Sequence, residues 1–324
     1  MLFGITLASF VLSQTVPVDP VTAQLGEQAA ADPEVVQAFR REWGLDRPLP
    51  EQYLRYLSNL VHGNMGVSLS TRQPVLLDLR QSFPATIELA VTAMVLSVIL
   101  GLPLGILSAV RRNSLLDQLT RVGALIGVSM PVFWLGLVGL SLFYARLGWV
   151  PEPGRLSASL TPPPFVTGFL LMDSLLSGRL DVALDSLRHL LLPALVLSTQ
   201  NLGVLARLMR GSMLEVMGED YIRTARAKGL AERRVMLRHA ARNGLIPIVT
   251  VIGVSFGRLL SGAVVIETVF AWPGLGLYAF RSATALDLPA IMGVGMVVAT
   301  VYILVNLLVD LAYALLDPRI RVGT

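Results

Sequence analysis

Long apolar runs alternate with short polar or basic segments along the whole chain. Six of these runs contain few or no charged residues, and each approaches the ~20 residues that cross a bilayer as a helix. They lack the alternating pattern of barrel strands, and a helix is the other backbone form that satisfies its own hydrogen bonds in hydrocarbon. The pattern therefore predicts an all-α integral membrane protein with about six transmembrane helices, at Met1–Val18, Leu89–Val110, Val122–Ala145, His189–Ala206, Asn243–Ile266 and Leu288–Val309.

The segments between the runs differ in charge, and this difference predicts the side of the membrane that each one occupies. Residues 207–242 contain nine basic and four acidic residues, and short loops rich in Lys and Arg stay in the cytoplasm. Alternation of the spans then puts both termini in the cytoplasm. We therefore expect a first span at 1–18, an extracytoplasmic helical cap at 19–83, and a five-span core at 84–324 that carries a cytoplasmic loop at 207–247.

The N-terminal quarter leaves one alternative open. The first apolar run starts at Met1 with no basic residue before it, so a signal peptide that ends near Ala23 is the alternative to a first membrane span. Within the expected cap, helix start and stop signals predict two short helices, from Asp32 to Gly44 and from Pro50 to Gly63.

The composition agrees with a membrane protein and excludes several kinds of chemistry. Of the 324 residues 54% are hydrophobic and 15% are charged, against about 25% charged in a soluble domain. The chain has no cysteine, and its three histidines lie in separate regions without zinc-site spacing. Its single lysine, Lys228, follows Ala227 and not the glycine of a phosphate-binding loop. We expect no catalytic residue, no metal site and no cofactor in this chain.

A few polar and small residues inside the spans have more than one interpretation. Arg258 would be costly at the centre of a span, so we expect either a structural ion pair or a place in the solute path. Glu88 and Glu267 are expected at span ends, where headgroup water hydrates a carboxylate. Small residues such as Gly101 and Gly105 are typical of close helix packing.

The most specific pattern is the segment Asp220–Pro247, which reads DYIRTARAKGLAERRVMLRHAARNGLIP. Small residues beside many arginines predict a short helix, a tight turn at Gly229 and a second helix. The tendency of basic loops to stay in the cytoplasm explains the arginines of this segment, but it does not explain the predicted turn. This segment is therefore a candidate docking surface for a soluble partner.

In this segment the chain resembles the peptide and nickel branch of ABC importer permeases, whose cytoplasmic loop docks on an ATPase subunit. The resemblance covers nearly the whole chain. It implies that the ATPase-coupling residues are Asp220, Tyr221, Thr224, Ala225, Arg226, Ala227, Lys228 and Gly229. Further strings that match in family order are Gly44–Tyr53, Gly63–Ser68, Pro84–Leu89, Val265–Phe270 and Asn306–Ile320.

The resemblance implies an ATP-driven importer of dipeptides or oligopeptides in the cell inner membrane. Its expected partners are a second homologous permease, two ATPase subunits that bind ATP and Mg, and an extracytoplasmic solute-binding protein. A nickel or other small-solute permease of the same branch is the alternative, and a secondary transporter or channel without ATPases is another. The family has a basic start before its first span, which leaves open that the first span is truncated here.

Overall fold

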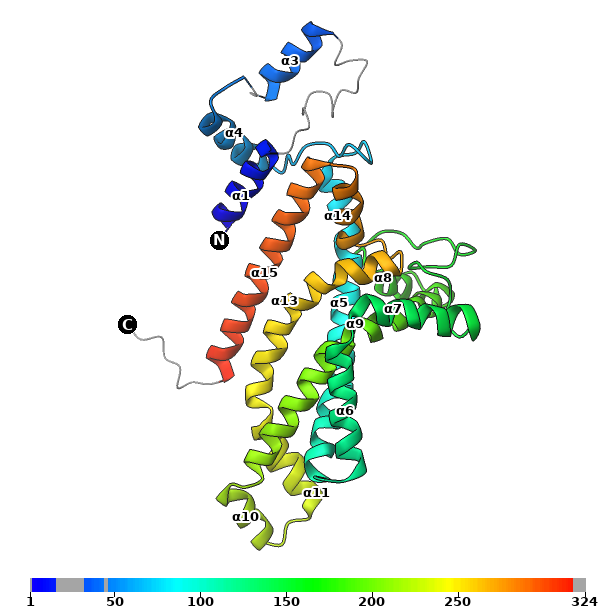
Figure 1. Ribbon diagram of the computed structural model, residues 1–324, viewed down its shortest axis with the longest axis vertical. Helices are drawn as coiled ribbons and strands as arrows, with labels where there is room; N and C mark the ends of the chain where they lie inside the picture. Colours follow the sequence, from blue (N-terminus) through cyan, green and yellow to red (C-terminus); the bar gives the residue numbers. More distant parts are fainter. Residues whose placement is uncertain (1, 16–31, 44–45, 317–324) are drawn as a thin grey trace, which may run out of the picture. The chain divides into compact units, whose positions relative to one another are not determined.

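The computed structural model describes residues 2–15, 32–43 and 46–316. Within these ranges the regular structure is helical, apart from a single bridge between Val67 and Pro74. The chain forms two compact units, one built from residues 1–84 and 274–303 and the other from residues 85–273 and 304–324. The expected all-α architecture is confirmed for the described residues (Figure 1).

The first unit joins N-terminal helices to a C-terminal helix pair. Its core packs Val75 and Leu79 against Tyr278 and Val294. Asp287 caps the last helix, because its Oδ1 accepts a hydrogen bond from Ala290 N at 3.3 Å. Its Oδ2 accepts a second hydrogen bond, from Ser68 Oγ at 2.6 Å, which ties this cap to the N-terminal part of the unit. The helices are α1 (Leu2–Thr15), α3 (Pro33–Trp43), α4 (Leu49–Val61), the start of α5 (Val75–Val110), α14 (Leu275–Thr284) and the start of α15 (Leu288–Leu316). The two short helices expected near residues 32–44 and 50–63 are thus confirmed.

The second unit is organised around the long helix α9 (Leu180–Val216), which packs against α6, α7, α8 and α13. Its main apolar core contains Leu89, Leu190, Ile266 and Trp272. Besides the rest of α5 and α15, its elements are α6 (Leu115–Ser129), α7 (Val132–Gly139), η1 (Leu140–Arg146), α8 (Leu170–Leu176), α10 (Asp220–Ala227), α11 (Glu232–Arg234), η2 (Val235–Ala240), α12 (Ala241–Gly244) and α13 (Ile246–Val269).

Two glycines let neighbouring helices approach α9 more closely than any side chain would allow. A Cβ atom at Gly105 of α5 would lie 2.6 Å from Ala206 O and 2.7 Å from Met209 Cβ. A Cβ atom at Gly203 of α9 would lie 2.8 Å from Ala124 O in α6. Both atoms would collide, so the close packing of α5, α9 and α6 requires glycine at these positions.

Among the described helices, two are long and apolar enough to cross a membrane, namely α5 and the Leu288–Leu308 part of α15. Up to four qualify if each bent pair counts as one span. The predicted span Val122–Ala145 is one such pair, bent by 103°. The bend falls at Pro131, because Met130 before it adopts an extended conformation that ends α6.

Six spans are predicted, but among the described residues only two to four segments meet the length and composition of a membrane span. The second bent pair joins Glu232–Gly244 to Ile246–Leu260 at 46°, where the sequence predicts one span. The predicted span His189–Ala206 lies inside the much longer α9. The first predicted span is represented by α1, which has 14 residues. Met1, residues 16–18 and the alternative cleavage site near Ala23 lie outside the described residues.

Candidate functional site

The candidate docking segment begins with α10 and a tight turn. Gly229 follows the helix with φ +73°, and its N–H donates to Arg226 O at 2.9 Å, while Leu230 N donates to Ala225 O at 3.4 Å. This pair of hydrogen bonds is the Schellman arrangement that ends a helix at a left-handed glycine. The predicted turn at Gly229 is confirmed, and any side chain there would be strained although the surrounding space is open.

The helix α10 has one buried face and one exposed face. Ile222 and Ala225 point into the core, with exposed fractions of 0% and 7%. Of the eight residues that the resemblance assigns to the coupling motif, Ala225 is thus the buried one. The other seven are exposed: Asp220, Tyr221, Thr224, Arg226, Ala227, Lys228 and Gly229. The exposed face can meet a partner, whereas Ala225 serves the packing of the helix.

Polar contacts join α10 to later residues of the same docking segment. Arg226 donates through Nε and Nη2 to the two carboxylate oxygens of Glu232, at 3.2 and 2.8 Å, and these hydrogen bonds raise the pKa of Arg226. Asn243 Nδ2 donates to Tyr221 OH at 2.7 Å. Exposed ion pairs contribute little stability, so these contacts shape the surface while the core holds the segment in place.

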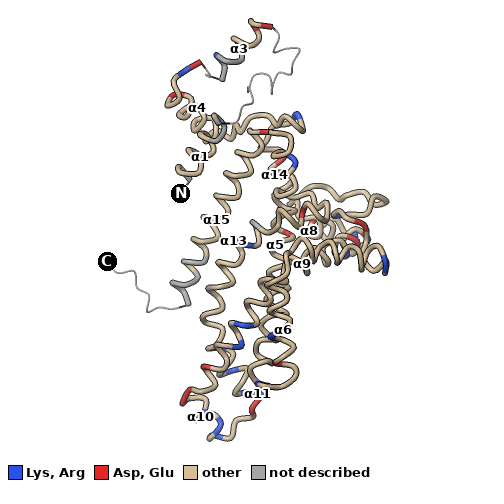
Figure 2. The backbone as a smooth tube through the Cα atoms, in the orientation of Figure 1, with Lys and Arg blue, Asp and Glu red and all other residues tan. Residues whose placement is uncertain are grey.

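An apolar core joins this segment to the long helices. It combines the fully buried Met209 and Met213 of α9 with Ile222 of α10, Val235 of η2 and Ile248 of α13. In addition, Ser212 Oγ donates to Gly244 O at 2.9 Å. Figure 1 shows α10 and α11 at one end of the second unit, and Figure 2 shows Lys and Arg positions gathered there. The structure thus brings the residues of the predicted motif together on one helix and its turn.

Arg258 lies on α13, outside the candidate docking segment Asp220–Pro247, hereafter the coupling segment. Its side chain is exposed and makes no hydrogen bond or ion pair with other residues that the structure describes. The structural pairing that the sequence allowed is therefore not seen within the described chain.

Two carboxylates near the predicted span ends differ from expectation. Glu88 and Glu267 are buried, with exposed fractions of 7% and 0%, so the expected hydration by headgroup water was wrong. Glu88 Oε2 accepts from Arg155 Nη2 at 2.5 Å, and Glu267 Oε1 accepts from Thr86 Oγ1 at 2.6 Å. Sequence reasoning did not find Arg155, since 67 residues separate it from Glu88 and neither local sequence signals the pairing.

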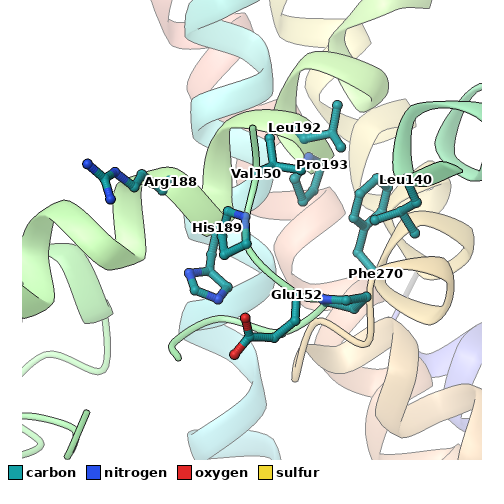
Figure 3. A pocket seen from close by; sticks show the side chains of 11 residues that line it. Leu140, Val150, Glu152, Arg188, His189, Leu192, Pro193 and Phe270 are labelled. Carbon is teal, nitrogen blue, oxygen red and sulfur yellow. The ribbon is translucent and has the colours of Figure 1, made fainter. Parts of the chain in front are cut away.

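A small pocket lies beside the start of the apolar part of α9 (Figure 3). Its lining includes His189, Glu152 and Phe270. Its volume of about 10 Å³ is close to the minimum for one water molecule, which is too small for a peptide. His189 Nδ1 lies 2.9 Å from Asp185 O, and Nε2 is buried without a hydrogen-bond partner among the residues that the structure describes. Among the described residues no three His, Cys, Asp or Glu side chains are grouped to hold a metal ion.

The helical fold and its apolar spans define the class of α-helical integral membrane proteins, and comparison with known proteins identifies the family. Residues 101–322 match the family described as "Binding-protein-dependent transport system inner membrane component". Residues 1–90 match the N-terminal part of the membrane component of the same systems. The chain therefore belongs to this family of inner-membrane transport components.

Individual relatives are similar over nearly the whole chain. The probable D,D-dipeptide transport system permease protein DdpB of Escherichia coli (strain K12) is 50% identical, over 99% of this chain and 94% of the relative. The di/tripeptide transport system permease protein DppB of Pseudomonas aeruginosa (strain UCBPP-PA14) is 47% identical, over 98% and 94%. The dipeptide transport system permease protein DppB of Escherichia coli (strain K12) is 45% identical, over 98% and 94%.

Family membership confirms several expectations at once. The chain is a multi-pass, all-α permease subunit of the inner membrane, and it is not itself an enzyme. It works with an ATPase, which binds the ATP, and with a solute-binding protein. A channel or secondary transporter that functions without an ATPase is thereby excluded.

Proposed function

We propose that this chain moves dipeptides and short oligopeptides into the cell, after an extracytoplasmic binding protein delivers them. The relatives with 45–50% identity all carry peptide transport in their names. Identity at this level over nearly the full length supports a shared substrate class.

In this proposal the complete importer contains a second homologous permease and two ATPase subunits. The exposed face of α10 and the turn at Gly229 form the docking surface for one ATPase. The observation that carries this assignment is the combination of an exposed helix–turn with a buried attachment, since Ile222 and Ala225 anchor the same helix in the core around Met209 and Met213. Force applied to the exposed face is thereby transmitted to α9.

The proposed orientation puts residues 207–247 and both termini in the cytoplasm. Residues 19–83 then form an extracytoplasmic cap after a first span at 1–18, and residues 84–324 form the core that carries the solute. The excess of basic over acidic residues in 207–242 supports this orientation.

Arg258 is proposed to line the solute path. It lies on α13 with an exposed side chain, and a guanidinium group in a membrane span requires water, a carboxylate or a partner subunit. A peptide supplies such a carboxylate at its C-terminus, and arginine recognises carboxylates with two parallel hydrogen bonds.

The coupling assignment predicts that Gly229→Asp uncouples uptake from ATP hydrolysis. The aspartate would strain the left-handed turn and change the docking surface, while the core residues of α10 stay unchanged. Uptake of a labelled dipeptide should fall by more than about tenfold, a coupling change of ~1.4 kcal/mol. Uptake is measured in cells that lack their other peptide importers, and the amount of protein in the membrane should stay the same.

Gly178→Asp is the matched control for this variant. Gly178 has φ +70° and open space around it, and it ends α8 with the same two hydrogen bonds, from Gly178 N to Leu175 O and from Arg179 N to Ser174 O. The control should retain uptake. Equal loss in both variants would attribute the effect to turn strain and remove the coupling assignment. Uptake of nickel in place of dipeptide by the wild-type protein would contradict the substrate class.

A further inference from the structure

Asp117, near the start of α6, has a fully buried carboxylate with four hydrogen-bond donors. Its Oδ1 accepts from Arg210 Nε at 2.7 Å and from Ser108 Oγ at 2.5 Å. Its Oδ2 accepts from Arg210 Nη2 at 3.0 Å and from Asn113 N at 2.9 Å. Arg121 Nε lies farther away, at 3.7 Å from Oδ1, so the bidentate pair with Arg210 is the closer interaction and favours one geometry.

The four donors come from three parts of the chain. Ser108 lies near the end of α5, Asn113 lies in the turn between α5 and α6 with φ +64°, and Arg210 lies on α9. Asp117 therefore fastens the α5–α6 turn to α9. One helical turn before Ser108, Gly105 brings α5 into close contact with α9, so the two attachments support one another.

The same stretch of α9 also holds the coupling segment, through an apolar core that includes Ala109 near the end of α5. Met209 and Met213, on either side of Arg210 in the sequence, are fully buried in the core that contains Ile222 and Val235. Ser212 Oγ donates to Gly244 O. One turn of α9 is thus attached to the coupling segment through its methionines and to the α5–α6 turn through Arg210.

We propose that Asp117 is a positioning residue for ATP coupling, which makes the start of α6 move together with α10. The inference rests on the proposed function of α10 as the ATPase-docking element. Movement of α10 passes through the methionine core to α9, and the Arg210–Asp117 pair transmits it to the α5–α6 turn. Without the carboxylate, the start of α6 follows α9 less closely, because only the apolar packing of α5 and α6 against α9 then remains.

The test measures whether α6 and the coupling segment move as one body. The chain has no cysteine, so Leu119→Cys and Ala231→Cys, both at exposed positions, introduce the only two spin labels in this subunit. In the assembled importer with its ATPases, the distance distribution between the labels is compared without nucleotide and after trapping with ATP and vanadate. The distribution should be the same in both states for the labelled wild type, and it should shift or broaden on trapping in Asp117→Asn.

Asp173→Asn is the matched control. Asp173 is another buried carboxylate, and it accepts hydrogen bonds from Val166 N, Gly168 N and both polar groups of Thr167. It fastens the turn before α8, and among the described residues its hydrogen-bond donors all lie at 166–168, outside the coupling segment, so this variant should behave like the wild type. A shift in Asp173→Asn equal to that in Asp117→Asn would overturn the proposal, because general destabilisation would then explain both.

A milder variant covers the case in which Asp117→Asn fails to assemble. Ser108→Ala removes one of the four donors and should give a smaller change in the same direction. Distributions that stay unchanged in both variants, or that change on trapping in the wild type, would overturn the proposal. A single label at Ala231 separates the two levels of the argument. If its mobility does not respond to the ATPase, the docking assignment fails and the proposal fails with it, whereas a response without the paired-label change rejects Asp117 alone.

Discussion

At the scale of single residues, the neighbours of a side chain decide its role, and these are often distant in sequence. Glu88 is predicted from its position to be hydrated at the membrane surface, yet it forms a buried ion pair with Arg155, which also lies over the Trp272 ring at 5.8 Å from its centroid. Ala225 belongs to the predicted coupling motif, yet it is buried. Position along the chain identifies candidates, and burial separates packing residues from surface residues.

Arg258 gives a prediction at this scale. Arg258→Ala should reduce dipeptide uptake roughly 10- to 100-fold, the equivalent of one charge-assisted hydrogen bond, while the subunit still assembles with its ATPases. Arg258→Lys should retain part of the uptake, because it keeps the charge but loses the two parallel donors. Uptake by purified importers in vesicles is the measurement.

An exposed arginine outside α13 serves as the control. Arg281 on α14 is exposed, and Arg281→Ala should leave uptake near the wild-type level. Normal uptake in Arg258→Ala would remove this residue from the solute path. Loss of ATPase binding in the same variant would assign it a structural role instead.

At the scale of elements, α10 is a short helix whose two faces perform different tasks. The inward face carries Ile222 and Ala225 and joins the core of α9, whereas the outward face carries most of the predicted motif. The turn at Gly229 ends the helix, so that Leu230 returns to the same core. The element is thus rigidly attached and still exposed.

The two faces predict opposite outcomes for the same substitution at two alanines. Ala225→Leu should lower the thermal stability of the subunit, because overpacking a core costs about 1–3 kcal/mol. Ala227→Leu lies on the exposed face and should change stability by less than about 0.5 kcal/mol, but it should weaken copurification of the ATPase. Thermal unfolding in detergent and copurification are measured on both variants. Equal destabilisation of the two would contradict the assignment of faces.

At the scale of the whole molecule, the two units each unite segments that are distant in sequence. The first combines residues 1–84 with 274–303, so α14 and the start of α15 pack with the beginning of α5. The second holds α9, the coupling segment and the buried ion pairs of Asp117 and Glu88. Contacts across such separations leave no periodic pattern in the sequence.

The proposed orientation predicts which surfaces face each side of the membrane. Because the chain has no cysteine, a single introduced cysteine reports one position. In spheroplasts, a maleimide that does not cross membranes should label Leu54→Cys and Ser159→Cys, which are exposed. It should label Ala231→Cys only after the membrane is opened. Labelling of Ala231→Cys in intact spheroplasts would reverse the proposed orientation.

The sequence by itself determined the class of the protein, because long apolar runs need a bilayer and can satisfy their backbone there as helices. It also located the helix–turn at Gly229, the element proposed to couple to the ATPase, since this turn depends on residues close together in the chain. The tertiary structure alone decided which of those residues are exposed, where Glu88 finds its counter-ion, and how Asp117 connects α6 to α9. These features depend on contacts between distant segments, which hydrophobic periodicity does not encode. For the same reason the full extent of α9 emerged only from the packed helices.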